Sequence, residues 1–467
     1  MVKGLSRTLL IAVVLLACIP VTLALAADPS EELQNELRVP STPGGPASPP
    51  GQTGEEQEQA WNIHAQNTDI DQWHPRYPAA YSGPQSLSDR SEDRETVSVD
   101  VYAGVRLWRG AEVYVDGLMW QGWGLSHTFG VAAFPNGEAF RLGTNLPQGT
   151  VARLFVRQTI GLGGEQEPVE DDQLQLAGNR DVSRITLTMG KLSVKDLFDS
   201  NAYANDPRTQ FLNWSLLANG AWDYPADSLG YTTGFAAELN QPHWAVRYGV
   251  FQIPTHLNAM AADPSYLEAW SMVTELEGRY AVATHPGAIR VLTFLTRGHM
   301  GKYQDALNAP ERPADTTPFR GGFHVKYGVG LNMDQEVIQG VGVFTRLGWS
   351  DGHTDSWMFT DVDRTASVGV SIKGGFWQRP EDTVGMAGVL NGLSRVHQDY
   401  FAAGGLGILV GDGTLSYGWE RLLEVYYDVH IWKGLHAALD YQFVVNPAYN
   451  RDRGPVSVLG ARVHWSF

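Results

Sequence analysis

The chain has 467 residues, of which 34 are Lys or Arg and 51 are Asp or Glu, so its formal net charge is −17. This acidic balance argues against a nucleic-acid partner, because binding a phosphate backbone needs clustered basic residues. A bundle of membrane-spanning helices is also excluded, since each helix would need about 20 consecutive apolar residues and only the first 27 residues approach this. With 15 Trp, 18 Tyr and 17 Phe, the chain is too rich in apolar rings for a disordered tract.

Residues 1–26 have the features of a secretory signal peptide. Two basic residues precede an apolar run from Leu9 to Ile19, and Ala24–Leu25–Ala26 offers the small-residue pattern of a cleavage site. A membrane-anchor helix is one alternative, but the run is about half the length that a bilayer requires. A lipoprotein signal at Cys18 is another, although the chain stays apolar beyond it. We expect export, which leaves a mature chain without cysteine and therefore without disulfides.

Residues 27–60 are expected to form a flexible tail ahead of the fold. The stretch from Arg38 to Gly54 is rich in Pro and Gly, which fit neither a helix nor a sheet ladder. The predicted organisation is therefore a signal peptide over residues 1–26, a Pro-rich tail over 27–60 and one β domain over 61–467.

Beyond residue 60 the dominant pattern is a period-two alternation of apolar and polar residues, which is typical of strands with two different faces. From Thr96 to Trp108, the odd-numbered residues Val97 to Leu107 are apolar, whereas Asp100 and Arg106 lie on the opposite face. Fifteen segments of this kind are clear. They start near residues 96, 112, 151, 183, 231, 243, 272, 288, 321, 341, 366, 383, 420, 435 and 456.

A sixteenth strand is expected, because single-chain bacterial outer-membrane barrels have an even number of antiparallel strands. Ile63–Ile70 is the best segment for it. With this strand included, short connections alternate with long ones, as periplasmic turns alternate with external loops in such barrels. One exception is Gly161–Val182, a long acidic segment at a position where a turn is expected.

These patterns predict an all-β fold, a 16-stranded antiparallel transmembrane β-barrel with short periplasmic turns and long extracellular loops. A barrel of this size leaves an aqueous channel, so the apolar strand faces would contact lipid and the charged faces would enclose water. The alternative is a secreted, water-soluble sandwich or propeller, but no internal repeat of roughly 40–50 residues is visible. The last strand ends in the aromatic Phe467, which resembles the signature that outer-membrane barrels present to the barrel-assembly machinery.

Several stretches resemble the carbohydrate-selective porin family (OprB type). The most specific is the block from Asp206 to Trp214 together with the block from Asn219 to Asp227. Shorter matching stretches are Tyr81–Leu87, Gln121–Ser126, Phe134–Ala139, Asn391–Ser394, Ala403–Gly407 and Gly411–Gly413. The resemblance covers residues from about 62 to the end. It implies a 16-stranded outer-membrane channel that passes sugars by diffusion.

The polar strand faces supply candidate pore-lining residues of both signs. Strand parity places the following on the polar face: Arg106, Arg153, Arg157, Arg184, Arg247, Arg290, Asp100, Glu112, Asp116, Glu275 and Glu277. Arginine stays charged and presents five donors in a planar fork, which suits sugar hydroxyls. The alternative is that these groups pair across strands and only keep the lumen polar. A mixture of both signs favours a neutral polar solute over an ion.

The connection from Ser193 to Gly230 is the candidate for a constriction. As a hypothesis, it folds inward, with Trp faces for sugar stacking and amides for hydroxyls. The alternative is that its Trp residues pack the loop against the barrel wall. The candidate residues are Asn205, Asn213, Trp214, Asn219, Trp222 and Asp223.

Catalytic interpretations receive little support from the sequence. Ser126–His127 lacks the second glycine of a nucleophile elbow. The spacing of Glu275 and Glu277 is compatible with a glycosidase pair, but the same spacing occurs on any polar strand face. The segment from Asp351 to Asp355 lacks a recognised metal-ligand spacing.

We therefore expect a passive outer-membrane sugar porin of a Gram-negative-type bacterium, with no catalysis, metal or cofactor. Its partners would be mono- or oligosaccharide solutes and outer-membrane lipid, with no nucleic acid. The barrel would be a single copy or a homotrimer. The alternatives are an outer-membrane barrel enzyme or adhesin, and a secreted carbohydrate-binding β protein.

Overall fold

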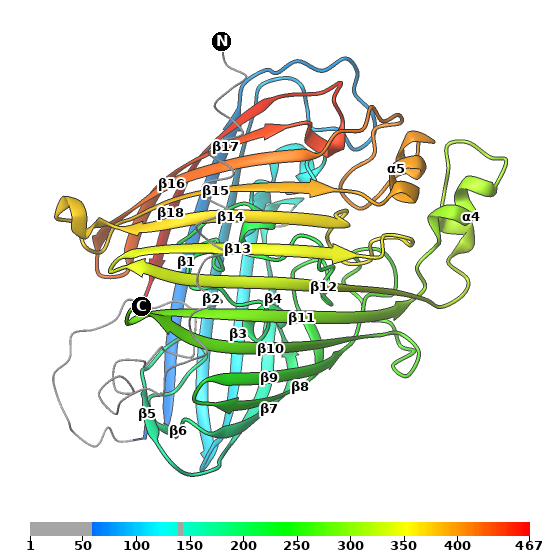
Figure 1. Cartoon of the computed structure of the whole chain (residues 1–467). Helices are drawn as coiled ribbons and strands as arrows, with labels where there is room; N and C mark the ends of the chain where they lie inside the picture. Colours follow the sequence, from blue (N-terminus) through cyan, green and yellow to red (C-terminus); the bar gives the residue numbers. More distant parts are fainter. Residues whose placement is uncertain (1–57, 139–142) are drawn as a thin grey trace.

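The computed structural model describes residues 58–138 and 143–467, and within them sixteen strands close into one antiparallel barrel (Figure 1). Each strand pairs with its neighbours along the chain, and β1 closes the barrel by pairing with β18. The barrel strands are β1 (Trp61–His74), β2 (Glu92–Trp108), β3 (Ala111–Trp123), β4 (Gly143–Gly161), β7 (Arg184–Leu192), β8 (Thr232–Gln241), β9 (Trp244–Phe251), β10 (Trp270–Val282), β11 (His285–Gly298), β12 (His324–Ile338), β13 (Val341–Ser350), β14 (Arg364–Lys373), β15 (Thr383–Gly392), β16 (Glu420–Trp432), β17 (Leu435–Val445) and β18 (Val456–Ser466).

The connections hold the remaining elements. A separate two-stranded sheet is made of β5 (Gln166–Val169) and β6 (Gly178–Asp181). The helices are α3 (Trp214–Leu217), α4 (Tyr303–Asn308) and α5 (Arg395–Ala402), with 3₁₀ turns η2 (Leu125–Thr128), η3 (Val194–Asp196), η4 (Thr317–Phe319), η5 (Gly374–Trp377) and η6 (Pro447–Tyr449). In the described part of the chain, these helices are too short or too polar for any of them to span a bilayer.

The predicted sixteen-stranded barrel is confirmed, including the strand inferred from Ile63–Ile70, which is β1. The largest departure is β4, which begins at Gly143 rather than near residue 151. Its first residues, 143–150, do not alternate in polarity, and they pair with β3 through two register shifts. A bulged ladder of this kind moves side chains off a strict period of two, so the pattern was not visible in the sequence.

The two faces of β2 have the predicted orientation. On β2, Val101 is 50% exposed on the outside, whereas the neighbouring Asp100 is fully buried on the lumen side. Exposed aromatic residues gather near the end of the barrel where β1 begins and β18 ends, among them Trp61, Trp108, Trp432 and Phe467. Apolar outer walls that end in aromatic residues are the features that seat a barrel in a bilayer.

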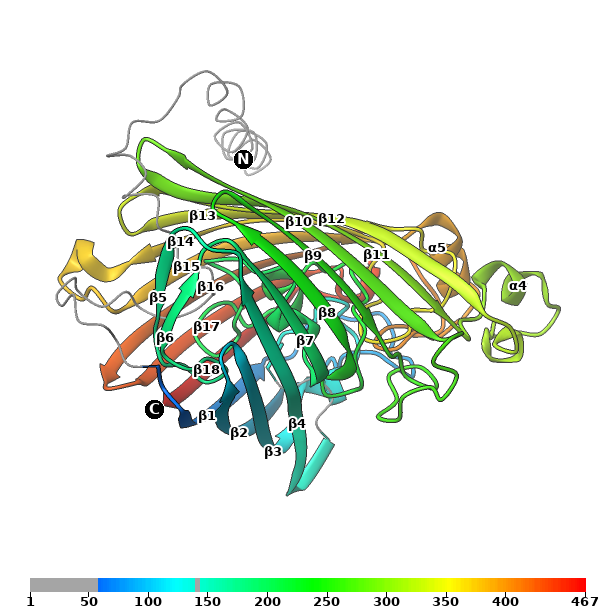
Figure 2. The same cartoon turned by 90° about the horizontal axis from the view of Figure 1, so that it is seen from below.

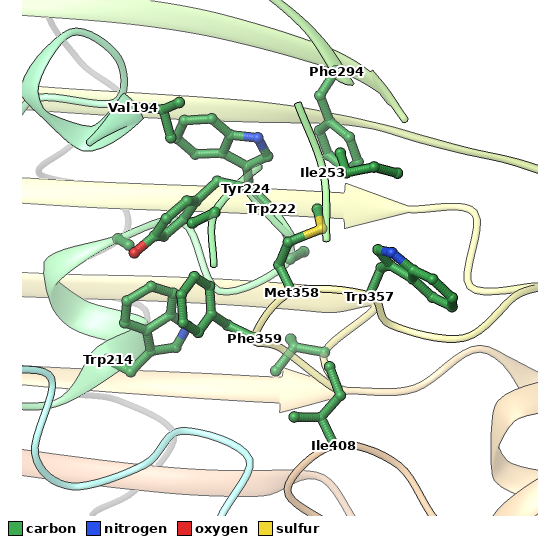
Figure 3. Close-up of a cluster of buried hydrophobic side chains, with 14 of the residues drawn as sticks. Val194, Trp214, Trp222, Tyr224, Ile253, Phe294, Trp357, Met358, Phe359 and Ile408 are labelled. Atoms are coloured by element: carbon green, nitrogen blue, oxygen red, sulfur yellow. The ribbon is translucent and has the colours of Figure 1, made fainter. Parts of the chain in front are cut away.

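The sequence predicted a water-filled lumen, but part of the lumen is occupied by protein segments. Long connections at one end fold inward and pack into an apolar core inside the barrel (Figure 3). This core includes Trp222 and Tyr224 from the β7–β8 connection, Met358 and Phe359 from the β13–β14 connection, and Ile408 from the β15–β16 connection. The solute path is therefore shaped by loops as well as by the wall.

The connections differ between the two ends of the barrel, as predicted. At the end near the C-terminus they are short, for example residues 109–110, 242–243, 339–340 and 433–434. Two connections at this end are longer: residues 374–382 between β14 and β15, and residues 162–183 between β4 and β7, which contain the β5–β6 hairpin (Figure 2). Inward-folding long connections arise from the opposite end, which corresponds to the extracellular side of an outer-membrane barrel.

We predict that an outward-facing charge destabilises the barrel according to its depth. Leu439, in the middle of β17, is 71% exposed, and Leu439→Arg should lower the free energy of unfolding in lipid vesicles by about 2–4 kcal/mol. Ile431, beside the β16–β17 turn, is also exposed, and Ile431→Arg should cost about 0–1 kcal/mol. Urea unfolding titrations measure both values, and equal losses at the two sites would contradict this orientation in the membrane.

Candidate functional site

The connection between β7 and β8, residues 193–231, crosses the lumen instead of extending outward. It starts against β10, β12 and β13, through contacts of Asp199 and Asn201. Its middle contacts β16 through Asn213, and its tip reaches β18 and β2 through Pro207 and Arg208. This inward loop is the segment that the sequence indicated as a constriction.

Asp199 fixes the start of the inward loop to the barrel wall. Its carboxylate accepts hydrogen bonds from Arg346 Nε at 3.1 Å, Asn332 Nδ2 at 2.7 Å and Lys195 Nζ at 3.0 Å. The main-chain N–H of Asp199 donates to Glu275 on β10 at 2.7 Å. Burial would raise the pKa of Asp199, but Arg346 and Lys195 outweigh it and lower the pKa from 3.8 to about 2. Its stabilising charge is therefore fully present above pH 3.8 and is lost only as the pH falls through about 2.

Glu424 on β16 holds the middle of the inward loop. Its two carboxylate oxygens accept the main-chain N–H groups of Leu212 at 2.6 Å and Asn213 at 2.9 Å. In the same way, Glu420 accepts the N–H groups of Ala132 at 2.9 Å and Ala133 at 2.7 Å, from the β3–β4 connection. Wall carboxylates thus satisfy loop amides that would otherwise be buried without partners.

A further carboxylate joins two inward segments to each other. Asp223 accepts hydrogen bonds from the main-chain N–H groups of Trp357 at 2.6 Å and Phe359 at 2.8 Å. Beside it, Trp214 stacks on Phe134 with ring centroids 4.9 Å apart. The inward loop is therefore part of a packed domain inside the barrel.

The six constriction candidates divide into one partly exposed residue and five buried ones. Asn205 is partly exposed near the loop tip. The other five are at most 3% exposed: Asn213, Trp214, Asn219, Trp222 and Asp223. Their contacts are with protein groups, so the packing alternative describes them in this conformation, and their rings are not presented to a solute.

Arg208, at the tip of the inward loop, was missed by sequence reasoning. Its Nη2 lies 3.0 Å from Glu138 and 3.4 Å from Asp100 on β2. Burial raises the pKa of Glu138 to about 7, and Arg208 opposes this shift. Arg462 on β18 donates to the main-chain oxygen atoms of Pro207 and Gln210, both at 2.7 Å. The sequence feature that could have identified Arg208 is its position as an isolated arginine in the β7–β8 connection, which is the longest connection between two strands.

The wall formed by β8 to β12 carries a connected set of ion pairs. Arg247 Nη1 lies 2.8 Å from both Glu275 and Glu277, and Arg290 bonds Glu277 at 3.0 Å and Asp334 at 2.5 Å. The register places Arg247 opposite Glu275, and Arg290 opposite Glu277. Both glutamates are committed to arginine partners, which does not resemble a glycosidase acid–base pair.

The remaining pore-lining candidates lie on β2, β3, β4 and β7. Arg153 pairs with Asp116 at 2.6 Å and with Asp196 of the inward loop at 2.7 Å. Arg106 pairs with Glu112 at 3.1 Å. Arg157 and Arg184 instead contact the β4–β7 connection. The predicted residues therefore share the lumen, but in several separate groups.

Some polar atoms near the loop tip have no hydrogen-bond partner within residues 58–138 and 143–467. They include Asp100 Oδ1, Asp116 Oδ1, Asn205 Oδ1 and Arg208 Nε. Buried polar atoms cost free energy unless they are bonded. Because these atoms are buried, they suit a small partner such as an internal water molecule rather than a sugar.

Comparison with known proteins gives one family and one fold. The model of the carbohydrate-selective porin, OprB family, matches residues 85–467. A search of curated proteins finds no match. The high-pH structure of Pseudomonas putida OprB is similar at 16% identity and a TM-score of 0.65, covering 87% of this chain and 94% of that chain. Its low-pH structure gives 12% identity, coverage of 87% and 93%, and a TM-score of 0.47. The structure of Pseudomonas aeruginosa OccK2 (OpdF) is 10% identical, covers 88% of this chain and 99% of that chain, and has a TM-score of 0.44.

We predict that removing the Glu424 carboxylate loosens the inward loop. Glu424→Ala leaves the N–H groups of Leu212 and Asn213 without acceptors, which costs about 1–3 kcal/mol for each. The folded variant should then be cut by trypsin after Arg208, whereas the wild type resists. Glu336→Ala is the matched control, because Glu336 accepts an N–H from Gly340 in a short turn. Equal resistance of the Glu424 variant and the wild type would contradict the role of this carboxylate.

Proposed function

Because the chain belongs to the carbohydrate-selective porin family OprB, we propose that it is an outer-membrane channel through which sugars diffuse passively into the periplasm. The observation that carries the proposal, beyond family membership, is the meeting of Arg208 with Asp100 and Glu138 at the tip of a fixed inward loop. This junction places donors and acceptors of both signs at a narrowing of a polar lumen.

The charge arrangement suits neutral, hydroxyl-rich solutes. The basic and acidic groups of the lumen neutralise one another in pairs, as Arg153 does with Asp116 and Arg247 with Glu277. A lumen of paired charges presents strong hydrogen-bonding groups while giving neither ion sign a large advantage. We propose that Arg208, which is partly exposed at the loop tip, contacts the hydroxyl groups, and that the buried carboxylate of Asp100 holds its guanidinium in place.

An aromatic surface for the sugar ring is available on the same side of the lumen. Trp120 of β3 and Tyr231 of the inward loop belong to one small apolar cluster, and the guanidinium of Arg153 lies 5.1 Å from the Tyr231 ring centroid. A sugar has an apolar ring face between its hydroxyl groups, and aromatic side chains bury such faces. We assign this stacking role to Trp120, which is partly exposed and packs on the buried Tyr231, in place of the buried Trp214 and Trp222.

Export and assembly complete the proposal. We infer that residues 1–26, which lie outside the described residues, are removed as a signal peptide, and that the barrel-assembly machinery recognises the strand that ends at Phe467. The outward apolar faces, such as Val101 and Leu439, would then contact outer-membrane lipid.

The proposal predicts size-dependent sugar permeation. Liposomes containing the purified protein should swell in isotonic sugar solutions, fastest with monosaccharides and more slowly with each added sugar unit, because pore diameter and lining groups set permeation. Heat-denatured protein provides the control. Swelling no faster than in protein-free liposomes would contradict the channel function.

Arg208 is predicted to contribute to sugar binding. Arg208→Ala should weaken the block of ionic current by sugar about tenfold, the effect of losing one hydrogen bond to a charged group. It should also shift selectivity toward cations, because Asp100 and Glu138 lose their partner. Arg421→Ala is the matched control, since Arg421 is exposed on β16 and lies on the outward-facing parity. Planar-bilayer recordings that are identical for the two variants would contradict the role of Arg208.

A further inference from the structure

The β4–β7 connection, residues 162–183, differs from the other connections at its end of the barrel. Several of those connections have two residues, such as 109–110 and 433–434, whereas this one folds as the β5–β6 hairpin. Figure 2 shows the hairpin lying across the end of the barrel where β1 begins and β18 ends. Its backbone reaches inward, because Leu176 is only 2% exposed and belongs to the apolar core of the lumen.

The hairpin is held to β1 by side-chain contacts with its tip. Asn62 Nδ2 donates to Asp171 Oδ1 at 2.7 Å and to the main-chain oxygen atoms of Asp172 at 2.9 Å and Gln175 at 3.0 Å. His64 Nε2 lies 3.1 Å from the same Asp171 carboxylate. One amide side chain thus organises the turn of the hairpin.

Three other strands hold the opposite side of the hairpin. Arg157 of β4 donates to the main-chain oxygen of Leu174 at 2.8 Å, and Arg184 of β7 donates to Glu167 at 3.0 Å. The hydroxyl of Tyr114 on β3 accepts the main-chain N–H of Leu176 at 3.1 Å. Of these three contacts, Arg184 with Glu167 joins opposite charges and the other two are hydrogen bonds to the main chain, so ion pairing and backbone hydrogen bonds together hold the hairpin against the wall.

The hairpin and the inward loop meet on the same two strands. Gln173 at the hairpin tip donates to Gln66 of β1 at 2.8 Å, and Gln66 donates to Asp100 of β2 at 2.9 Å. Asp100 is also the partner of Arg208. Segments that enter from opposite ends of the barrel are therefore linked through Gln66 and Asp100.

From this geometry we propose that the hairpin of residues 162–183 is a second selectivity element, a fixed strap that narrows the periplasmic exit and forms a sugar subsite with β2 to β4. The proposal rests on the proposed function and adds a site to it. Its groups are the amide of Gln173 and the paired Arg106 and Glu112, which all stay partly exposed. They offer donors and acceptors to the hydroxyl groups of a sugar after it passes Arg208.

The test replaces residues 162–183 by Asn-Gly, a sequence that closes two-residue hairpins. Gly161 and Arg184 are already paired across β4 and β7, so the barrel ladder is preserved. Conductance in KCl should rise roughly two-fold or more, because pore diameter limits permeation. Liposome swelling should extend to larger oligosaccharides. The control deletes residues 375–381 at the same end, since Gly374 and Asp382 are already bonded at 2.9 Å and then form the turn.

Point variants test the strap without shortening the chain. Asn62→Ala removes three donations to the hairpin and should increase open-channel current noise and the sugar size limit. Asn67→Ala is the matched control, because Asn67 lies on the outward parity of β1 and donates to Ser98. These variants decide the question if the hairpin replacement does not fold.

The outcomes separate this proposal from the channel function. Wild-type conductance and sugar size limit in the folded hairpin variant would overturn the strap, as would identical behaviour of the Asn62 and Asn67 variants. Failure of the wild type to pass sugars would instead overturn the proposed function. The KCl measurement does not depend on sugar transport, so a rise in conductance would still support the exit narrowing.

Discussion

Buried carboxylates that accept main-chain N–H groups are the interaction on which the interior of this barrel depends. A loop that enters the lumen brings backbone donors that neither a strand nor a long helix satisfies, and an unsatisfied buried donor is costly. Glu275, Glu420 and Glu424 on the wall accept such donors, and Asp223 does the same between two loops. Because each of these carboxyl groups satisfies main-chain donors that would otherwise be buried without acceptors, these few residues fix the shape of the channel.

The polar side chains of the lumen therefore have two different tasks. Glu424 is fully buried beneath the inward loop, so it shapes the pore without reaching a solute. Arg208 is partly exposed and faces the carboxylate of Asp100. Family resemblance and parity alone do not separate these tasks, because both residue types are polar and both point inward. The separation arises only when the loops cover one part of the wall.

The barrel was predictable from sequence, whereas the constriction was predictable only in outline. Lipid on one side of a strand and water on the other impose a period of two on its residues, so Val101 and Asp100 were assigned to the correct faces. The strand β1 was found because such barrels have an even number of strands. The start of β4 was missed because its bulged ladder lacks alternation. The roles of Trp214 and Trp222 depend on Phe134 and Phe359, which lie on other connections. No local pattern encodes contacts of that kind.

The two inserted segments converge on β1 and β2, so the groups proposed for selectivity lie on one side of the barrel. The inward loop covers the part of the wall from β10 to β18. Its Asp199 and Leu212 bond β13 and β16, and Arg462 of β18 bonds the loop at Pro207. In the proposed channel, solutes would pass along the remaining wall, where Gln66 bonds both Asp100 and Gln173. In this proposal, two narrowings in series would discriminate by size twice while keeping every contact weak enough for release. A passive channel requires such weak, repeated contacts, because tight binding at a single point would slow the flux.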